Sequence, residues 1–204
     1  MCFCGSSSGD GCGGDMISTP WAYIKNHGLV TGAQNNATAG PQADPFGSAG
    51  LCSSFSLPHC HHHGPQGLDP YPAEDAPGCP KATSPQCPTA CDAGARAPHA
   101  NFTADKWAFT GGAQSYAGEL AIQQAVMGYG PVEVAFTVYA DFESYASGIY
   151  SYDGTSEDLG GHAVKIVGWG IDAGTKYWKI ANSWNPYWGE YARSHTRSHA
   201  RSHQ

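Results

Sequence analysis

Hydrophobic side chains recur with regular spacing in the second half of the chain. Residues 120–129 carry apolar positions at helical intervals and are followed by a Gly-Pro pair, so they predict a short amphipathic helix that ends there. In residues 132–138, Val and Phe alternate with other residues, which indicates a strand with one buried face. Residues 162–168 and 176–181 predict two further strands, separated by Gly and Asp residues that favour turns.

The first half is organised differently. Residues 18–27 predict a helix, in which Ser18 is suited to the N-cap and Gly28 to a left-handed end. Residues 31–105 hold most of the proline, little apolar periodicity and five cysteines. A segment of this kind is ordered only if it is cross-linked. A loop-and-helix half therefore precedes a β-rich half, and the predicted fold class is α+β.

The last residues follow a repeat instead of a hydrophobic pattern. Residues 192–203 repeat a four-residue unit in which Arg-Ser-His follows Ala or Thr. Because the repeat has no apolar face, residues 191–204 are predicted to be a disordered, low-complexity tail. The alternative is a His-rich tail that binds metal.

Composition excludes some classes of partner. The net charge of −7 argues against nucleic acid as the main partner, because phosphate binding needs a concentrated basic face. No run of 18 apolar residues exists, so we expect no membrane span. Two sequons, at Asn36 and Asn101, predict glycosylation in a secretory compartment.

The cysteines indicate an oxidising compartment. There are eight, at positions 2, 4, 12, 52, 60, 79, 87 and 91. This density favours disulfides, and the rival reading, zinc, would favour C-x2-C pairs, which the sequence does not contain. No secretory signal precedes them. The expectation that reconciles these observations is a chain truncated at its amino end.

Two polar residues of the predicted strands suggest chemistry. His162 opens one strand beside small residues, and Asn182 follows another. An Asn oxygen that accepts from one ring nitrogen fixes the tautomer, and the other nitrogen then exchanges a proton with a nucleophile. Trp184 beside the pair would shield that hydrogen bond from water. The alternative is a structural histidine and an ordinary Asn-Ser turn.

Short motifs around these residues resemble those of cathepsin B-like peptidases, which are papain-like cysteine proteases. They occur in the family's order: Gly-Asp-Gly-Cys-Gly-Gly at 9–14, Gly-Leu-Val-Thr-Gly at 28–32, Gly-Pro-Val-Glu at 130–133, Val-Tyr-Ala-Asp-Phe at 138–142, Ser-Gly-Ile-Tyr at 147–150, Gly-Gly-His-Ala at 160–163, Gly-Trp-Gly at 168–170, Tyr-Trp at 177–178, Ala-Asn-Ser-Trp-Asn at 181–185 and Trp-Gly-Glu at 188–190.

The resemblance implies a fold and roles for residues. It implies a two-domain papain-like fold, here partial. Residues 1–108 would be a remnant of the helical left domain with a Cys-rich region at 52–91, and residues 109–190 the β-rich right domain. The roles that it implies are a catalytic base for His162, orientation of that base for Asn182, shielding for Trp184, and substrate binding for Gly14 and Gly161. The family glycine after Gly14 is Asp15 here, which leaves that subsite altered.

The segment Cys60-His61-His62-His63 resembles the occluding loop that is peculiar to cathepsin B. By resemblance, His62 and His63 hold the C-terminal carboxylate of a substrate, which makes the enzyme a carboxydipeptidase. A solvated His cluster and a metal site at His59, His61 and their neighbours are the alternatives. Residues 60–79 contain no Lys or Arg, and the position of the family's acidic partner is Tyr187 here. We therefore expect a mobile loop without the family's ion pair.

Other parts of the family pattern are absent. No Cys is followed by Trp, as the family nucleophile is, so the nucleophile is expected upstream of residue 1. A last strand is expected to be missing after Glu190. By resemblance, Cys52 pairs with Cys91, Cys60 with Cys79, and Cys87 with Cys2 or Cys4. The partner of Cys12 would lie upstream.

The function that the resemblance implies is a cysteine-type endopeptidase with carboxydipeptidase character, of which this chain is an incomplete copy without the nucleophile. The alternative is a non-catalytic relative that binds peptides or inhibitors. Peptide or protein substrates and cystatin-like inhibitors are the expected partners, and a monomer without cofactor or metal is expected. A lysosome or another acidic vacuole, or secretion, is the expected location.

Overall fold

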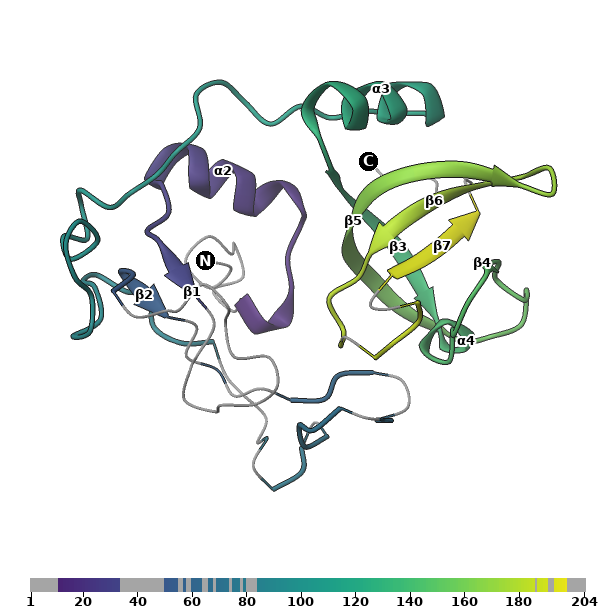
Figure 1. Cartoon of the computed structure of the whole chain (residues 1–204), viewed down its shortest axis with the longest axis horizontal. Coiled ribbons are helices and arrows are strands. Elements are labelled where there is room, and N and C mark those ends of the chain that lie inside the picture. The colour runs from purple at the N-terminus through teal and green to yellow at the C-terminus, as the bar shows by residue number, and fades with distance from the viewer. Residues whose placement is uncertain are drawn as a thin grey trace. The chain divides into compact units, whose positions relative to one another are not determined.

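We describe a computed structural model of the chain, which defines residues 11–33, 50–54, 57, 60–63, 66–67, 69–73, 75–77, 79, 84–185, 187–190 and 193–197. The chain divides into two compact units (Figure 1). Unit 1 is Met1–His59 with Asp75–Gln114, and unit 2 is Cys60–Glu74 with Ser115–Gln204. The boundary predicted at 108/109 differs from the division in the structure, which falls at 114/115. The Cys-rich region predicted to lie in one domain is divided, because residues 60–74 belong to unit 2.

Unit 1 contains the predicted helix. Its elements are η1 (Gly11–Gly13), α2 (Ser18–His27) and two short parallel strands, β1 (Gly32–Ala33) and β2 (Ser53–Ser54). Ser18 is not the N-cap, because the helix begins with Ser18 itself and no side chain caps it. The carboxylate of Asp15 instead accepts from the Thr19 hydroxyl at 3.1 Å, and an acid at this end complements the helix dipole. Gly28 ends α2 with φ +71° but an extended ψ of 168°.

The proline-rich part of unit 1 is held by polar and covalent links. Asp105, which is 4% exposed, accepts from the Thr31 N–H at 2.7 Å, the Thr31 hydroxyl at 2.7 Å and His99 Nδ1 at 2.6 Å. Cys52 and Cys91 form a disulfide. These links join segments far apart in the sequence, which is what a region without apolar periodicity needs in order to be ordered.

In its described residues, unit 2 consists of a five-stranded sheet and two helices (Figure 1). The order in the sheet is β3-β5-β6-β7-β4. Its elements are α3 (Glu119–Tyr129), β3 (Val132–Tyr139), α4 (Ala140–Glu143), β4 (Ile149–Tyr150), β5 (Asp158–Asp172), β6 (Thr175–Ala181) and β7 (Arg193–Arg197). The helix and three strands that the hydrophobic pattern predicts are all present, and β5 is longer at both ends than predicted.

Two hydrophobic clusters form the core of unit 2 in the part of the chain that the structure describes. In the first, side chains of β5 and β6 pack beneath α3: Val164, Ile166, Trp178 and Ile180 are buried, with Ile122 and Val126 of the helix against them. The second is largely aromatic and surrounds α4: Val138, Phe142, Tyr145, Trp184 and Trp188. No helix in the described ranges has the length and apolar character needed to cross a membrane.

Strand β7 differs from the expectation of a disordered tail. Residues 193–197 pair antiparallel with β6, from Ala181 opposite Arg193 to Tyr177 opposite Arg197. Pairing in a sheet uses backbone N–H and C=O groups, which a polar repeat carries as well as an apolar one. The absence of an apolar face therefore does not exclude a strand at this position.

Candidate active site

The sheet register places His162 beside Asn182. Strand β3 pairs with β5 from Asp158 to Ile166, whereas β6 pairs with β5 only from Lys165, which lies opposite Ala181. The first residues of β5 therefore extend beyond the end of β6. Strand β6 ends at Ala181, opposite Lys165, and Asn182 follows it directly. His162 lies three residues before Lys165 on β5, so Asn182 comes to lie next to it.

A hydrogen bond joins the two side chains. His162 Nε2 lies 2.8 Å from Asn182 Oδ1. The Ser183 backbone N–H donates to the same oxygen, also at 2.8 Å. An amide oxygen only accepts, so Nε2 carries the ring proton and Nδ1 is the basic nitrogen of the neutral ring. The Asn182 amide nitrogen is buried and has no hydrogen-bond partner among the described residues.

The surroundings of His162 favour its neutral form. Burial of the half-buried ring lowers its pKa below the ordinary 6.5, since a charged imidazole loses hydration there. The hydrogen bond to Asn182 raises the pKa, and the charge of His63 lowers it further. The net result is a lowered pKa. A neutral imidazole with an unprotonated Nδ1 is the form that accepts a proton from a nucleophile.

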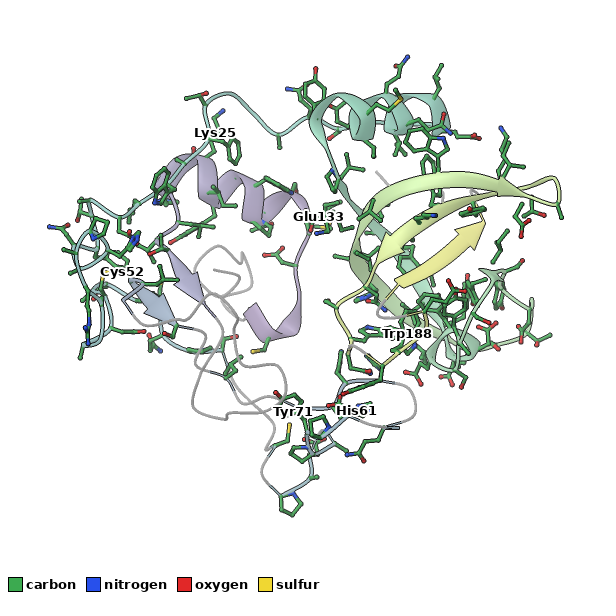
Figure 2. All side chains as sticks on the ribbon, in the orientation of Figure 1. Lys25, Cys52, His61, Tyr71, Glu133 and Trp188 are labelled. Carbon is green, nitrogen blue, oxygen red and sulfur yellow. A yellow bond between two sulfur atoms is a disulfide. The ribbon has the colours of Figure 1, made fainter. Side chains whose placement is uncertain are left out.

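Trp184 connects the pair to the aromatic core. Its ring lies 5.3 Å from the His162 ring and 4.8 Å from that of Trp188, which is labelled in Figure 2. Phe136, which lies opposite His162 in the register of β3 and β5, contacts the His162 ring edge-on at 5.8 Å. Only 6% of Trp184 is exposed. The imidazole thus packs against two aromatic rings, which are themselves closely packed.

The segment that begins with Cys60-His61-His62-His63, here called the histidine loop, also belongs to unit 2, and its His63 contacts Trp184. The His63 ring lies 4.4 Å from Trp184 and 3.8 Å from the His62 ring. His63 Nδ1 donates to Glu143 Oε1 at 2.9 Å. The Asn185 side-chain amide donates to the carbonyl oxygens of both His62 and His63, at 3.1 Å each. The predicted loop thus has a His–Glu pair, which is a different pair from the family ion pair that the sequence is expected to lack.

A second pair of residues organises the histidine loop internally. His61 Nδ1 lies 2.9 Å from Asp69 Oδ2, and both side chains are buried. Asp69 also accepts from the Tyr71 backbone N–H at 3.2 Å, and His61 donates its own N–H to the Pro72 carbonyl. His61 and Tyr71 are labelled together in Figure 2. Sequence analysis had considered His61 only as a metal ligand or a solvated residue.

Sequence analysis missed Glu143 and Asn185. A signal existed for each, because Glu143 follows the family motif at 138–142 directly and Asn185 ends the motif at 181–185. Their partners could not be read from the sequence, since Glu143 is 80 residues from His63 and Asn185 is 122 residues from it.

The remaining predicted site residues are distributed over both units. Gly161 precedes His162 on β5 and is exposed, and no described atom lies within 4 Å of the position of an added Cβ. Gly14 is exposed in unit 1, with φ +81°. Cys60, Cys79 and Cys87 are each disulfide-bonded, and Cys4 lies outside the described residues. The structure therefore brings together His162, Asn182, Trp184, His62 and His63.

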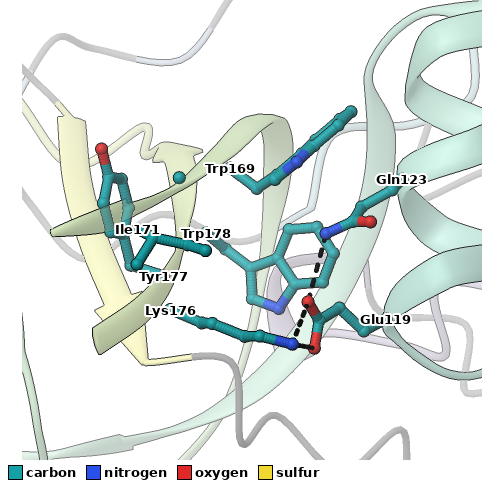
Figure 3. Close-up of a pocket in the computed structure, with 8 residues that line it drawn as sticks. Glu119, Gln123, Trp169, Ile171, Lys176, Tyr177 and Trp178 are labelled. Atoms are coloured by element: carbon teal, nitrogen blue, oxygen red, sulfur yellow. Dashed lines mark hydrogen bonds and ion pairs between the residues drawn. The ribbon is translucent and has the colours of Figure 1, made fainter. Parts of the chain in front are cut away.

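Neither a metal-binding cluster nor the hollow beside α3 adds to the candidate site among the described residues. No three His, Cys, Asp or Glu side chains are grouped as a metal would need in the part of the chain that the structure describes. A hollow of about 380 Å³ lies between α3 and the β5–β6 hairpin, with the Glu119–Lys176 ion pair (3.0 Å) in its wall (Figure 3). It contains none of the predicted site residues.

Comparison with known proteins gives consistent results. A family model described as papain family cysteine protease matches residues 1–202. A cathepsin B-like cysteine proteinase of Schistosoma japonicum is 40% identical over 188 residues, and cathepsin B-like cysteine proteinase 6 of Caenorhabditis elegans is 36% identical over 187 residues. These alignments cover 91% of this chain but 48% and 44% of the two relatives. The chain spans about half the length of the curated relatives that it matches.

A solved structure agrees with the sequence relatives. Procathepsin B S9 from Trypanosoma congolense matches with a TM-score of 0.59 and 26% identity, over 92% of this chain and 49% of that chain. The predicted fold class is therefore confirmed as a partial papain-like fold of helices and sheet.

Proposed function

Since the chain belongs to the papain family of cysteine proteases, we propose that it supplies the base of a cathepsin B-like active site. His162 is the general base, Asn182 orients it and Trp184 shields their hydrogen bond. The observation that carries this proposal is the 2.8 Å contact from His162 Nε2 to Asn182 Oδ1, which leaves Nδ1 as the proton acceptor.

The reaction that suits this arrangement is thiolate attack on a peptide carbonyl. A cysteine thiol would transfer its proton to Nδ1, the thiolate would attack the carbonyl carbon, and the imidazolium would return the proton to the leaving amine. Asn182 stabilises the imidazolium, since its hydrogen bond favours the charged ring. Burial against Trp184 prevents water from competing for Nε2.

The cysteines of this chain do not fit the role of nucleophile. Cys52, Cys60, Cys79, Cys87 and Cys91 are disulfide-bonded, and a disulfide sulfur is no thiolate. None of the eight cysteines is followed by Trp. We therefore propose that the 204 residues alone are inactive. The purified chain should neither hydrolyse a dipeptidyl-arginyl reporter nor react with an epoxide thiol probe, and clear labelling of one cysteine would contradict this.

A hybrid protein tests the base directly. A papain-family segment bearing the Cys-Trp nucleophile is fused ahead of residue 1, and thiol-dependent peptidase activity is measured. We expect the hybrid to be active. His162→Ala should lower its rate at least about 1,000-fold, because a nucleophile without its base loses several orders of magnitude in rate. His27→Ala, at the end of α2 in unit 1, is the matched control and should leave the rate unchanged.

The alternative is a non-catalytic relative that binds peptides or inhibitors. It predicts that the hybrid stays inactive even though it folds, as judged by near-UV circular dichroism. Activity that survives His162→Ala would contradict the assignment of the base in either case.

Substrates and location follow from the same proposal. We propose peptide or protein substrates, with His62 and His63 binding a C-terminal carboxylate so that the assembled enzyme removes dipeptides. Their place beside Trp184, next to the proposed base, supports this. Cystatin-like inhibitors are the expected protein ligands. The disulfide-bonded cysteines among the described residues support an oxidising location, a lysosome-like vacuole or the extracellular space.

A further inference from the structure

The side chain of Glu143 is hydrogen-bonded to His63, which is one of the two histidines proposed to bind the C-terminal carboxylate of the substrate. Glu143 Oε1 lies 2.9 Å from His63 Nδ1, and both side chains are about one third exposed (35% and 33%). Ligands therefore have access to this pair. A charge-assisted bond of this length is among the stronger side-chain contacts.

Both partners are held in place by the backbone around them. His63 has φ +56°, a left-handed conformation that is uncommon outside glycine, and the Asn185 side-chain amide donates to the carbonyl oxygens of His62 and His63. The His63 ring is also packed against Trp184 at 4.4 Å. Glu143 ends the short helix α4, and its carbonyl accepts from Trp188 Nε1 at 3.0 Å. The contact thus joins two fixed segments, and the left-handed residue lies where a functional role is proposed.

We propose that Glu143 is a specificity-determining residue, which neutralises His63 and so disfavours substrates that present a free C-terminal carboxylate at this position. The inference rests on the proposed carboxylate-binding role of His63. It goes further because it assigns to Glu143 an effect on the balance between endopeptidase and carboxydipeptidase activity. With Glu143 in place, peptides that continue past the site, or that end in an amide, bind about as well as those with a free C-terminal carboxylate.

Electrostatics gives the size of the effect. A ligand carboxylate that reaches His63 must displace Glu143 or lie beside it. Two like charges about 5–6 Å apart at a partly exposed site repel enough to weaken binding about fivefold. Glu143→Gln keeps the shape and a hydrogen-bonding oxygen but removes the charge, so it should restore that affinity.

The test measures ligand binding to the full chain, without catalysis. The ring signals of His63 are followed by NMR while N-acetyl-Ala-Ala or its C-terminal amide is added, at a pH where ordinary histidines are mostly protonated and ordinary carboxyl groups ionised. For the unaltered chain we expect the acid and the amide to bind within about twofold of each other. Glu143→Gln should bind the acid about fivefold more tightly and the amide unchanged.

Two further variants separate the possible failures. Glu157→Gln makes the same change in net charge at an exposed site and should leave both affinities unchanged. Adding His63→Ala to Glu143→Gln should abolish the gain for the acid. If Glu143→Gln gains no preference for acid over amide, including the case of no binding at all, the inference is overturned. If the gain persists without His63, the carboxylate-binding role in the proposed function fails instead.

Discussion

Replacing Trp184 by alanine tests whether the aromatic core holds the candidate base. Trp184 is 6% exposed and contacts the rings of Phe142, Trp188 and His162 at 5.5, 4.8 and 5.3 Å. A tryptophan buries roughly 150–250 Å² of mostly apolar surface, which at about 25 cal/mol/Å² corresponds to about 4–6 kcal/mol. Since the site relaxes partly, we expect Trp184→Ala to lower the free energy of unfolding by about 4 kcal/mol.

The assay follows urea unfolding of the chain by far-UV circular dichroism. Trp184→Phe, which keeps most of the apolar volume, should lose less than half as much and serves as the measurable variant if the alanine form does not fold. Trp107→Ala is the matched control, because Trp107 is 68% exposed, and it should change stability by no more than about 0.5 kcal/mol. A loss below about 1 kcal/mol for Trp184→Ala would refute the packing that we describe.

Three further outcomes depend on hydrogen bonds and burial. Asn182→Ala should lower the pKa of His162, since the lost hydrogen bond favours the protonated ring; NMR titration checks this, with Asn101→Ala as control. For Asp105, burial would raise the pKa, but hydrogen bonds from His99 and Thr31 outweigh it and hold the pKa below 3.8. Its stabilising effect is therefore present above pH 3.8 and is lost as pH falls through the lowered pKa, so the difference in stability between the unaltered chain and Asp105→Asn should shrink on acidification. For His162, whose pKa is lowered, stability is present above pH 6.5 and falls as pH drops below it, and His162→Gln should reduce that dependence.

Local periodicity was sufficient to predict the two longer helices and three of the strands. The alternation in residues 132–138 and the helical spacing in residues 120–129 each reflect one buried face, and β3 and α3 contribute such faces to the core. The helix at 18–27 was also predictable, although its N-cap was not. Ser18 has the right side chain for a cap, but Asp15 already bonds to Thr19 at that end. Which side chain bonds to the free groups at a helix end depends on all the partners near it, and the sequence does not show which of them will form the bond.

Long-range pairs were beyond prediction from one sequence. The repeat at 192–203 gave no sign of β7, because its strand pairs through the backbone with β6 and not through an apolar face. The resemblance implied the roles of His162 and Asn182 but implied none for Glu143, so it did not predict the Glu143–His63 pair. Contacts of this kind become visible only once a fold brings residues 80 positions apart together.

The supports of the candidate base all belong to unit 2. Strands β3, β5 and β6 set the position of His162, and the aromatic cluster with Trp184 fixes its ring. The contacts named here that organise the base therefore all lie within the described residues of unit 2. Substitutions in the two units should therefore differ in their effect on the pKa of His162. Asp105→Asn should leave the His162 titration unchanged while it destabilises unit 1, whereas Trp184→Ala should raise the pKa of His162 toward its ordinary value by exposing the ring to water. A shift of the His162 titration in Asp105→Asn would show that the base depends on both units.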